Sequence, residues 1–136
     1  MQPTVRVPDF EKRGGIVPVI IQDGRTGTVL ILAYTRKEEF LETLASGEVV
    51  LWSTLRNERW KKGETKSGNV LRLQKPPRLD CDGDALLYIV TQTKPESGAC
   101  HTGKETCFYR SVIGSIFEKD DHITLEILEV EDRLGS

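Results

Sequence analysis

Residues 80–84 read Asp-Cys-Asp-Gly-Asp and combine three carboxylates with a thiol. Carboxylate oxygens are the ligands that hard divalent cations such as Mg²⁺ prefer. On a straight strand alternate residues lie roughly 6.6 Å apart, so Asp80 and Asp84 would be separated by about 13 Å. One ion can bind Asp80, Asp82 and Asp84 only if the chain bends, which Gly83 permits, or if one acid binds through water. The alternative is a solvated turn, for which Asp and Gly are ordinary residues.

Three cysteines form a second set of candidate ligands: Cys81, which would face away from the acids, and Cys100 and Cys107 in a later, polar segment. Three thiolates that leave one position open match a catalytic zinc site, because structural zinc sites usually fill all four positions with protein. The spacing is not that of a CxxC knuckle, so each cysteine could instead be a small buried hydrophobe. That alternative fits Cys81 and Cys107, which border strand-like sequence, better than Cys100.

His101 follows Cys100 directly and is one of two histidines. Beside a metal ligand, its imidazole could take a proton from water or give one to a leaving nitrogen. A surface-loop histidine is the alternative, and we adopt it for His122. A cysteine–histidine nucleophile is disfavoured, because adjacent residues seldom reach the required geometry and no third group is evident to orient the histidine.

The composition limits the class of protein. The chain has 136 residues, of which 38% are hydrophobic and 29% charged, and these values predict one globular domain over residues 1–136. A net charge of -2 argues against general nucleic-acid binding. There is no apolar run near ~20 residues and no apolar signal core in residues 1–10, so we expect a cytoplasmic protein with reduced thiols.

Charge is unevenly distributed along the chain. Residues 56–72 contain six basic and two acidic side chains, which could attract a small anion. Residues 118–136 contain seven acidic and two basic side chains, and we expect this acidic C-terminal segment to be a solvated edge or tail.

The elements that would position the candidate ligands are mostly strands. Apolar and β-branched runs predict strands over residues 16–22, 28–34, 49–53, 70–73, 85–93, 107–113 and 123–130. Thr35 with Glu38 has the capping-box pattern of a helix start, and Gly47 is a reasonable stop. Phe40, Leu41 and Leu44 would form the apolar face of this helix. The fold class is therefore α+β, mostly β-sheet with one main helix.

Several segments together resemble the phosphoribosyl-AMP cyclohydrolase family of histidine biosynthesis. They follow the family order over about residues 16–110 and comprise residues 17–23, 26–34, 52–53, 60–65, 80–87, 98–103 and 107–108. The acid–thiol segment and the Ala-Cys-His-Thr-Gly segment at 99–103 are each distinctive, and their joint occurrence is hard to explain by chance.

The resemblance implies a monofunctional enzyme that uses Zn²⁺ and Mg²⁺. Six residues match the family's metal ligands: Cys81, Cys100 and Cys107 for zinc, and Asp80, Asp82 and Asp84 for magnesium. Family members are intertwined homodimers in which one subunit supplies the first cysteine and its partner supplies the other two. The resemblance therefore implies a zinc site shared between two copies of the chain.

The resemblance is weakest in the region expected to contact substrate. Residues 53–56 read Ser-Thr-Leu-Arg where the family has Ser-Arg-Ser-Arg, and residues 62–69 contain one extra residue and end in Asn69 where the family has His. The candidate substrate-binding residues are Trp52, Ser53, Arg56, Lys62, Gly63, Glu64, Ser67 and Gly68. Cationic side chains and the 67–68 backbone would hold phosphates, whereas a strand tryptophan is more often part of the core.

The expected reaction is ring opening of phosphoribosyl-AMP. Zinc would lower the pKa of water toward ~7, and this water would attack C6 of the adenine, as in zinc deaminases. The N1–C6 bond would then break to give the phosphoribosylformimino-AICAR product without loss of ammonia, with His101 moving the protons. Two alternatives stay open: a divergent zinc hydrolase or deaminase of another purine nucleotide, and a non-catalytic metal-stapled nucleotide-binding dimer.

Overall fold

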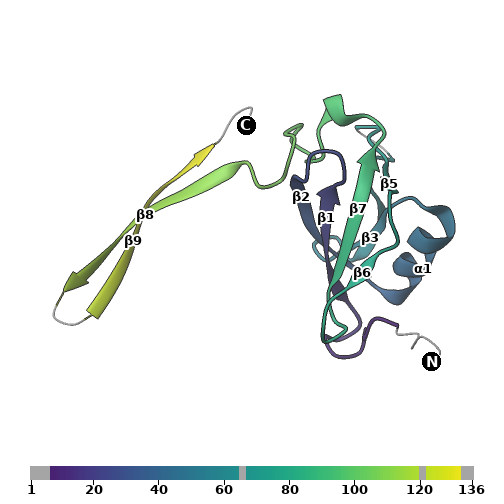
Figure 1. Cartoon of the computed structure of the whole chain (residues 1–136), viewed down its shortest axis with the longest axis horizontal. Coiled ribbons are helices and arrows are strands. Elements are labelled where there is room, and N and C mark those ends of the chain that lie inside the picture. Colours follow the sequence, from purple (N-terminus) through teal and green to yellow (C-terminus); the bar gives the residue numbers. More distant parts are fainter. Residues whose placement is uncertain (1–6, 65–66, 120–121, 133–136) are drawn as a thin grey trace.

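The computed structural model describes residues 7–64, 67–119 and 122–132. The elements, in chain order, are β1 (Val17–Asp23), β2 (Val29–Thr35), α1 (Lys37–Ser46), β3 (Val50–Ser53), β4 (Glu58–Lys61), β5 (Leu71–Leu73), β6 (Arg78–Leu79), β7 (Leu86–Gln92), the 3₁₀ turn η1 (Pro95–Ser97), β8 (Arg110–Lys119) and β9 (His122–Asp132). Figure 1 shows a sheet with one α-helix packed beside it. The predicted α+β class, mostly β-sheet with one main helix, is confirmed for the described residues.

The main sheet brings the ends of β1 and β7 together beside the loop that carries the candidate residues Cys100 and His101. Its order is β2-β1-β7-β5, and β6 also pairs with β7. Strand β1 runs antiparallel to β2 and parallel to β7. Strands β1 and β7 are parallel and end at the same edge of the sheet (Figure 1), where Nε2 of Gln92 lies 2.6 Å from Oδ2 of Asp23. The loop that carries Cys100 and His101 leaves the sheet from this edge.

One face of the sheet forms the core. Side chains alternate along a strand, and the apolar residues at alternate positions of β1 and β7 are at most 3% exposed: Val17, Val19, Ile21, Leu86, Tyr88 and Val90. β-Branched and aromatic side chains suit such a pleated, buried surface. Full burial of a Val, Leu or Phe side chain contributes roughly 1.5–3 kcal/mol, so this face holds the strands in place.

The opposite face of the sheet carries apolar side chains that this chain leaves uncovered. Ile20 lies opposite Leu32 on β2 and opposite Leu87 on β7, which makes an apolar row across three strands. Ile20 is 43% exposed and Leu32 is 50% exposed. Exposed apolar side chains gathered on neighbouring strands are typical of a contact surface.

Helix α1 begins differently from the prediction. Its N-cap is Arg36 and makes no side-chain cap hydrogen bond, while the Thr35 hydroxyl donates to the Arg36 carbonyl at 2.9 Å. The Arg36 guanidinium binds Glu39 at 2.7–2.9 Å. The predicted capping box is therefore wrong, because the Thr35 hydroxyl already has a partner. Gly47 ends the helix with φ 75°, as predicted.

The helix also buries a different face. Phe40 is buried as predicted, but Leu41 and Leu44 are 50% and 46% exposed, and the helix buries Glu39 and Thr43 instead. Thr43 takes part in a buried polar contact in which the Val50 N–H donates to its Oγ1 at 3.0 Å. That contact joins the helix to β3 and explains why a polar residue lies inside.

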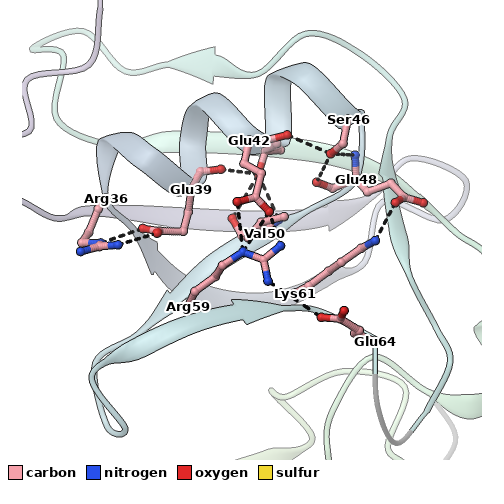
Figure 2. A network of polar contacts seen from close by, with 10 residues as sticks. Arg36, Glu39, Glu42, Ser46, Glu48, Val50, Arg59, Lys61 and Glu64 are labelled. Atoms are coloured by element: carbon pink, nitrogen blue, oxygen red, sulfur yellow. Dashed lines mark hydrogen bonds and ion pairs between the residues drawn. The ribbon is translucent and has the colours of Figure 1, made fainter.

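Ion pairs hold the β3–β4 hairpin against α1 and against the segment that follows the helix (Figure 2). The Arg59 guanidinium of β4 donates to both carboxylate oxygens of Glu42, with Nε at 2.9–3.0 Å. Lys61 pairs with Glu48 at 2.8 Å. Strand β4 was not predicted, because its four residues are mostly charged and only pairing with β3 makes them a strand. The hairpin matters because residues 53, 55, 56 and 60, with residues 62 and 63 after it, line the cavity described below.

The C-terminal strands differ from the prediction in extent. Strand β8 begins at Arg110, so Cys107, which was predicted to lie in a strand, lies in the loop before it. Residues 118–119 and 122–132 of the acidic segment belong to the β8–β9 hairpin, which extends away from the sheet (Figure 1). Residues 120–121 and 133–136 of that segment lie outside the described residues. None of the described helices is long and apolar enough to cross a membrane.

Candidate functional site

The chain bends sharply at Gly83, between two of the three acidic residues. Gly83 has φ +80°, which a glycine adopts without strain, and its N–H donates to the Asp80 carbonyl at 3.2 Å. Oδ1 of Asp80 accepts the N–H groups of Asp84 at 2.9 Å and Ala85 at 3.1 Å. As a result, one oxygen from each of Asp80, Asp82 and Asp84 lies within 4.8 Å of the others. The three acids are therefore gathered by a bend of the chain at Gly83, which was one of the two arrangements expected from the sequence.

Two cations offset part of the charge of this acidic cluster. Lys12 Nζ lies 3.2 Å from Oδ2 of both Asp82 and Asp84, and an Arg13 nitrogen lies 3.0 Å from Oδ2 of Asp84. The hydrogen bonds to Asp82 and Asp84 raise the pKa of Lys12. The sequence analysis missed both cations, because they lie about seventy residues away in the chain and carry no motif.

The acidic cluster fits a divalent cation. Asp84 is 1% exposed, and its Oδ2 accepts no well-directed hydrogen bond among the described residues, although the two cations are near. A buried carboxylate oxygen is costly unless a cation neutralises it, and Lys12 and Arg13 supply that charge at a position that a divalent cation could also take. Three clustered carboxylates are the oxygen donor set that Mg²⁺ takes, so these residues could hold one.

Cys100 and Cys107 lie together beyond the carboxyl end of β7. The Cys107 N–H donates to the Leu30 carbonyl of β2 at 2.8 Å, and the Cys100 N–H donates to the Lys104 carbonyl at 3.1 Å. The Thr102 hydroxyl donates to the Cys100 sulfur at 3.0 Å. Cys100 is buried, whereas Cys81 and Cys107 are exposed, so the expected order of burial is wrong. The reason is that the turn from Cys100 to Lys104 folds back over its own thiol.

The two neighbouring thiols differ in how readily they ionise. Burial opposes ionisation of Cys100, but hydrogen bonds from the Thr102 hydroxyl and backbone outweigh it and lower the pKa of this thiol. Cys107 is exposed as a residue, but partial burial of its thiol, with the adjacent Cys100, raises the pKa of this thiol to about 11. Cys100 therefore loses its proton more readily than Cys107, and a cation beside the pair would favour the thiolate form of both. Paired thiolates are ligands that zinc takes, so the donor set fits this metal.

Cys81 lies at the other end of the sheet from the thiol pair. It precedes β7, whereas Cys100 follows β7, and a strand of seven residues spans about 20 Å. The three sulfurs do not gather within 4.8 Å of one another, because the only such group among the described residues is the acidic cluster. Zinc–thiolate bonds are about 2.3 Å long, so one chain alone does not bring its three thiols to one zinc.

A cavity of about 630 Å³ opens beside Cys100. Its lining combines the β3–β4 hairpin, the loop after it and the loop after β7: Ser53, Leu55, Arg56, Trp60, Lys62, Gly63, Ser67, Ser97, Cys100, His101, Thr102 and Gly103. Five of the eight predicted substrate-binding residues are among these, together with the predicted catalytic residue His101. Leu55, Trp60, Ser97, Thr102 and Gly103 also line the cavity but were not predicted as site residues; they are uncharged, and Trp60, Thr102 and Gly103 were noted only as parts of the segments that carry the family resemblance.

The three other predicted substrate-binding residues do not line this cavity. Trp52 lies under the Arg36 guanidinium, whose Cζ is 3.7 Å from the centroid of the Trp52 ring. Glu64 is exposed and lies 4.0 Å from an Arg59 nitrogen. Gly68 is exposed and lies beside the Lys94 side chain.

Lys62 is a buried cation in the wall of the cavity. The residue is 4% exposed, and its ammonium lies 5.4 Å from the Trp60 ring centroid without an ion pair to any described residue. Burial lowers the pKa of Lys62, and the nearby Cys107 and Cys100 act in the opposite direction. A desolvated cation that faces a cavity is suited to bind an anionic group.

Comparison with known proteins identifies the family. A family model described as phosphoribosyl-AMP cyclohydrolase matches residues 31–109, more than half of the chain. A protein of that name from Rhodospirillum centenum is 53% identical over 98 residues, which cover 72% of this chain and 70% of the relative. Another from Cenarchaeum symbiosum is 48% identical over 105 residues, which cover 77% and 93%. The matched segment contains the cavity, the acidic cluster and all three thiols, and the chain belongs to the phosphoribosyl-AMP cyclohydrolase family.

Proposed function

We propose that this protein hydrolyses the N1–C6 bond of the adenine ring in phosphoribosyl-AMP, a step of histidine biosynthesis. One observation carries the proposal: in a chain of this family, the cavity combines Cys100 and His101 with the cations Arg56 and Lys62. The substrate has two phosphate groups, and cationic side chains bind phosphate well. Free cysteines throughout the chain support a reducing compartment, the cytoplasm.

The proposed metal ligands are Cys81, Cys100 and Cys107 for zinc, and Asp80, Asp82 and Asp84 for magnesium. Zinc, when bound, supplies a water acidic enough to attack adenine C6 near neutral pH. His101 is exposed at the rim of the cavity, where it can take a proton from the attacking water. It returns that proton to N1 as the N1–C6 bond breaks, so one water is added and no ammonia leaves.

We assign the remaining lining residues to the substrate. Arg56 and Lys62 face its phosphates, and Ser53 and Ser67 offer hydroxyls. The indole of Trp60, which also lines the cavity, offers an aromatic surface on which a purine can stack. Trp52, Glu64 and Gly68 lie outside the cavity of the single chain, so the proposal gives them no direct contact in it.

A second copy of the chain completes the proposed zinc site. The separation of Cys81 from the thiol pair by the length of β7 supports this, because Cys81 of a partner can lie where Cys81 of the same chain cannot. The uncovered apolar row of Ile20 and Leu32 supports a partner on the outer face of the sheet. Because Asp80 and Asp82 flank Cys81, the partner that supplies this thiol also brings its acidic cluster close to the zinc.

Turnover of phosphoribosyl-AMP by the purified protein tests the proposal. We expect a product heavier by one water, no ammonia, and loss of the reaction when zinc is chelated. Release of ammonia would instead indicate a deaminase of the same family. Binding of the nucleotide without turnover by folded, zinc-loaded protein would indicate a nucleotide-binding dimer and overturn the proposal.

A further inference from the structure

Asn69 is a fully buried amide that uses both N–H donors and its oxygen. It is 0% exposed. Its Nδ2 donates to Oε1 of Gln92 at 2.9 Å and to the carbonyl of Gly98 at 3.1 Å. Its Oδ1 accepts the N–H of Lys94 at 2.9 Å. No other side chain of similar size offers two donors and an acceptor in this arrangement.

The direction of these hydrogen bonds is set by Asp23, at the end of β1. Nε2 of Gln92 donates to Oδ2 of Asp23 at 2.6 Å. A carboxylate can only accept, so Gln92 must turn its NH₂ group toward Asp23 and its oxygen toward Asn69. Asn69 must then turn its own NH₂ group toward Gln92 and Gly98. Asp23, Gln92, Asn69 and Gly98 therefore form a chain of hydrogen bonds, called here the amide chain, in which Asn69 donates both toward Asp23 through Gln92 and toward Gly98.

The amide chain ends two residues before the Cys100 thiol. Gly98 has φ +79°, and a Cβ atom on it would lie 2.5 Å from the Lys104 carbonyl oxygen. That same oxygen accepts the Cys100 N–H at 3.1 Å. The turn that carries Cys100 is thus in close contact with the Gly98 peptide. The hydrogen bond from Asn69 fixes the carbonyl of that peptide.

The backbone of Asn69 also supports the opposite wall of the cavity. A Cβ atom on Gly63 would lie 2.2 Å from the Asn69 carbonyl oxygen, so these two backbones are in close contact. Gly63 follows Lys62, the buried cation of the cavity. One residue outside the cavity therefore contacts both loops that form it, the Lys62 loop through its backbone and the Cys100 loop through its amide.

We propose that Asn69 is a positioning residue for Cys100: the amide chain holds the Gly98 peptide so that the thiol points toward its metal. The proposal rests on the proposed function only in that Cys100 binds zinc. A buried asparagine that merely stabilised the fold would change the free energy of unfolding and leave the metal site of the folded protein unaltered. A positioning residue changes the metal site itself, and loss of such outer contacts typically weakens metal binding 10–100-fold.

The test uses Asn69→Asp in the full-length protein, titrated with Co²⁺ as a spectroscopic substitute for zinc. The variant keeps the shape of the side chain but sets a carboxylate oxygen against the oxygens of Gln92 and Gly98. We expect Co²⁺ affinity at least tenfold weaker and an altered thiolate-to-cobalt charge-transfer band. The kcat should fall more than the KM changes. Asn57→Asp makes the same atomic change at an exposed position and should behave as the parent protein does.

Asp23→Asn is the second variant, and it decides the question if Asn69→Asp does not fold. Asp23 lies at the far end of the amide chain and outside the lining of the cavity beside Cys100. The substitution removes the carboxylate that fixes the orientation of the Gln92 amide. We expect the same change in the cobalt spectrum, smaller in size. Parent-like cobalt affinity and spectrum in the folded variants would overturn the proposal. Failure of the parent protein itself to bind Co²⁺ would instead overturn the proposed zinc site, and the inference with it.

Discussion

Cys81 and Cys100 lie beyond opposite ends of β7, a strand whose seven residues span about 20 Å. The acidic cluster lies at the Cys81 end, and the cavity with His101 lies at the Cys100 end. Cys81 and the acidic cluster therefore cannot act together with Cys100, Cys107 and the cavity of the same chain. In the proposed enzyme, a second copy of the chain brings its Cys81 end to the Cys100 end of the first.

The outer face of the sheet should be the contact surface for that copy. Leu32→Glu places a carboxylate in the exposed apolar row, where burial of an unpaired charge costs several kcal/mol. We expect a monomer by light scattering, with little bound zinc and little activity. Leu44→Glu, on a helix residue that is 46% exposed, is the matched control and should stay dimeric. A dimeric, active Leu32→Glu protein would place the contact elsewhere.

Lys62 should contribute to substrate binding at a cost to stability. Lys62→Met keeps the length of the side chain and removes a buried charge that lacks an ion pair. Loss of a charge-assisted hydrogen bond should lower kcat/KM about 10- to 100-fold. The free energy of unfolding should stay equal or rise, because the desolvated charge is gone. Lys61→Met is the control, since Lys61 pairs with Glu48 outside the cavity, and should leave kcat/KM unchanged. Parent-like KM in Lys62→Met would remove this residue from the substrate site.

The stability of the fold should fall in acid through Glu39. The Arg36 hydrogen bonds lower the pKa of this carboxyl from 4.5, and its side chain is 3% exposed. Because the pKa of Glu39 is lower in the folded protein than in the unfolded chain, its carboxylate stabilises the folded state at pH values above the pKa of the unfolded chain. This contribution disappears as the pH falls through the pKa of the folded protein. We expect urea unfolding to show constant stability from neutral pH to about pH 5 and a decline below about 4.5.

Glu39→Gln isolates this contribution. The variant should be less stable at pH 7 by about 1–3 kcal/mol and should lose less stability in acid than the parent protein. Glu42→Gln is the comparison, because Glu42 is 40% exposed in its pair with Arg59 and salt screens such pairs (Figure 2). An acid transition of the same size in the Glu39→Gln and parent proteins would show that other groups control it.

Lys12 should compete with a divalent cation at the acidic cluster. Its ammonium lies 3.2 Å from carboxylate oxygens of Asp82 and Asp84, where a metal would also bind. We expect Lys12→Met to bind Mn²⁺, measured by electron paramagnetic resonance, several-fold more tightly than the parent protein. Lys37→Met, at an exposed helix position, should not change the affinity, and Asp84→Asn should abolish the site. Weaker Mn²⁺ binding in Lys12→Met would mean that Lys12 organises the carboxylates instead of competing for them.

Local patterns predicted those parts of the fold that depend on neighbours in sequence. Alternating β-branched residues located β1 and β7, and Gly47 located the helix end, because these signals act within a few residues. Strand β6 was missed, since its two residues become a strand only by pairing with β7. The capping box failed because the buried Thr35 hydroxyl binds the Arg36 carbonyl.

The site was predicted in its residue types but not in its arrangement. The acids and thiols were evident as ligands, and Gly83 indicated that the acids could gather. The strand predicted over residues 85–93 lies between Cys81 and Cys100, but the path of the long loops beyond its ends, which decides whether the thiols meet, depends on contacts far apart in the sequence. The role of Asn69 depends on Gln92 and Gly98, which lie 23 and 29 residues away.

Subunit complementation tests the shared zinc site most directly. Cys81→Ser and Cys107→Ser should each be inactive, and each should be unable to hold zinc. The two variants are then unfolded together and refolded with zinc, so that about half of the dimers are mixed. Each mixed dimer has one intact site of two. About one quarter of the parent activity should therefore return. If all three thiols instead act within one chain, no mixed dimer contains an intact site. Activity no higher than that of the single variants would then contradict the account.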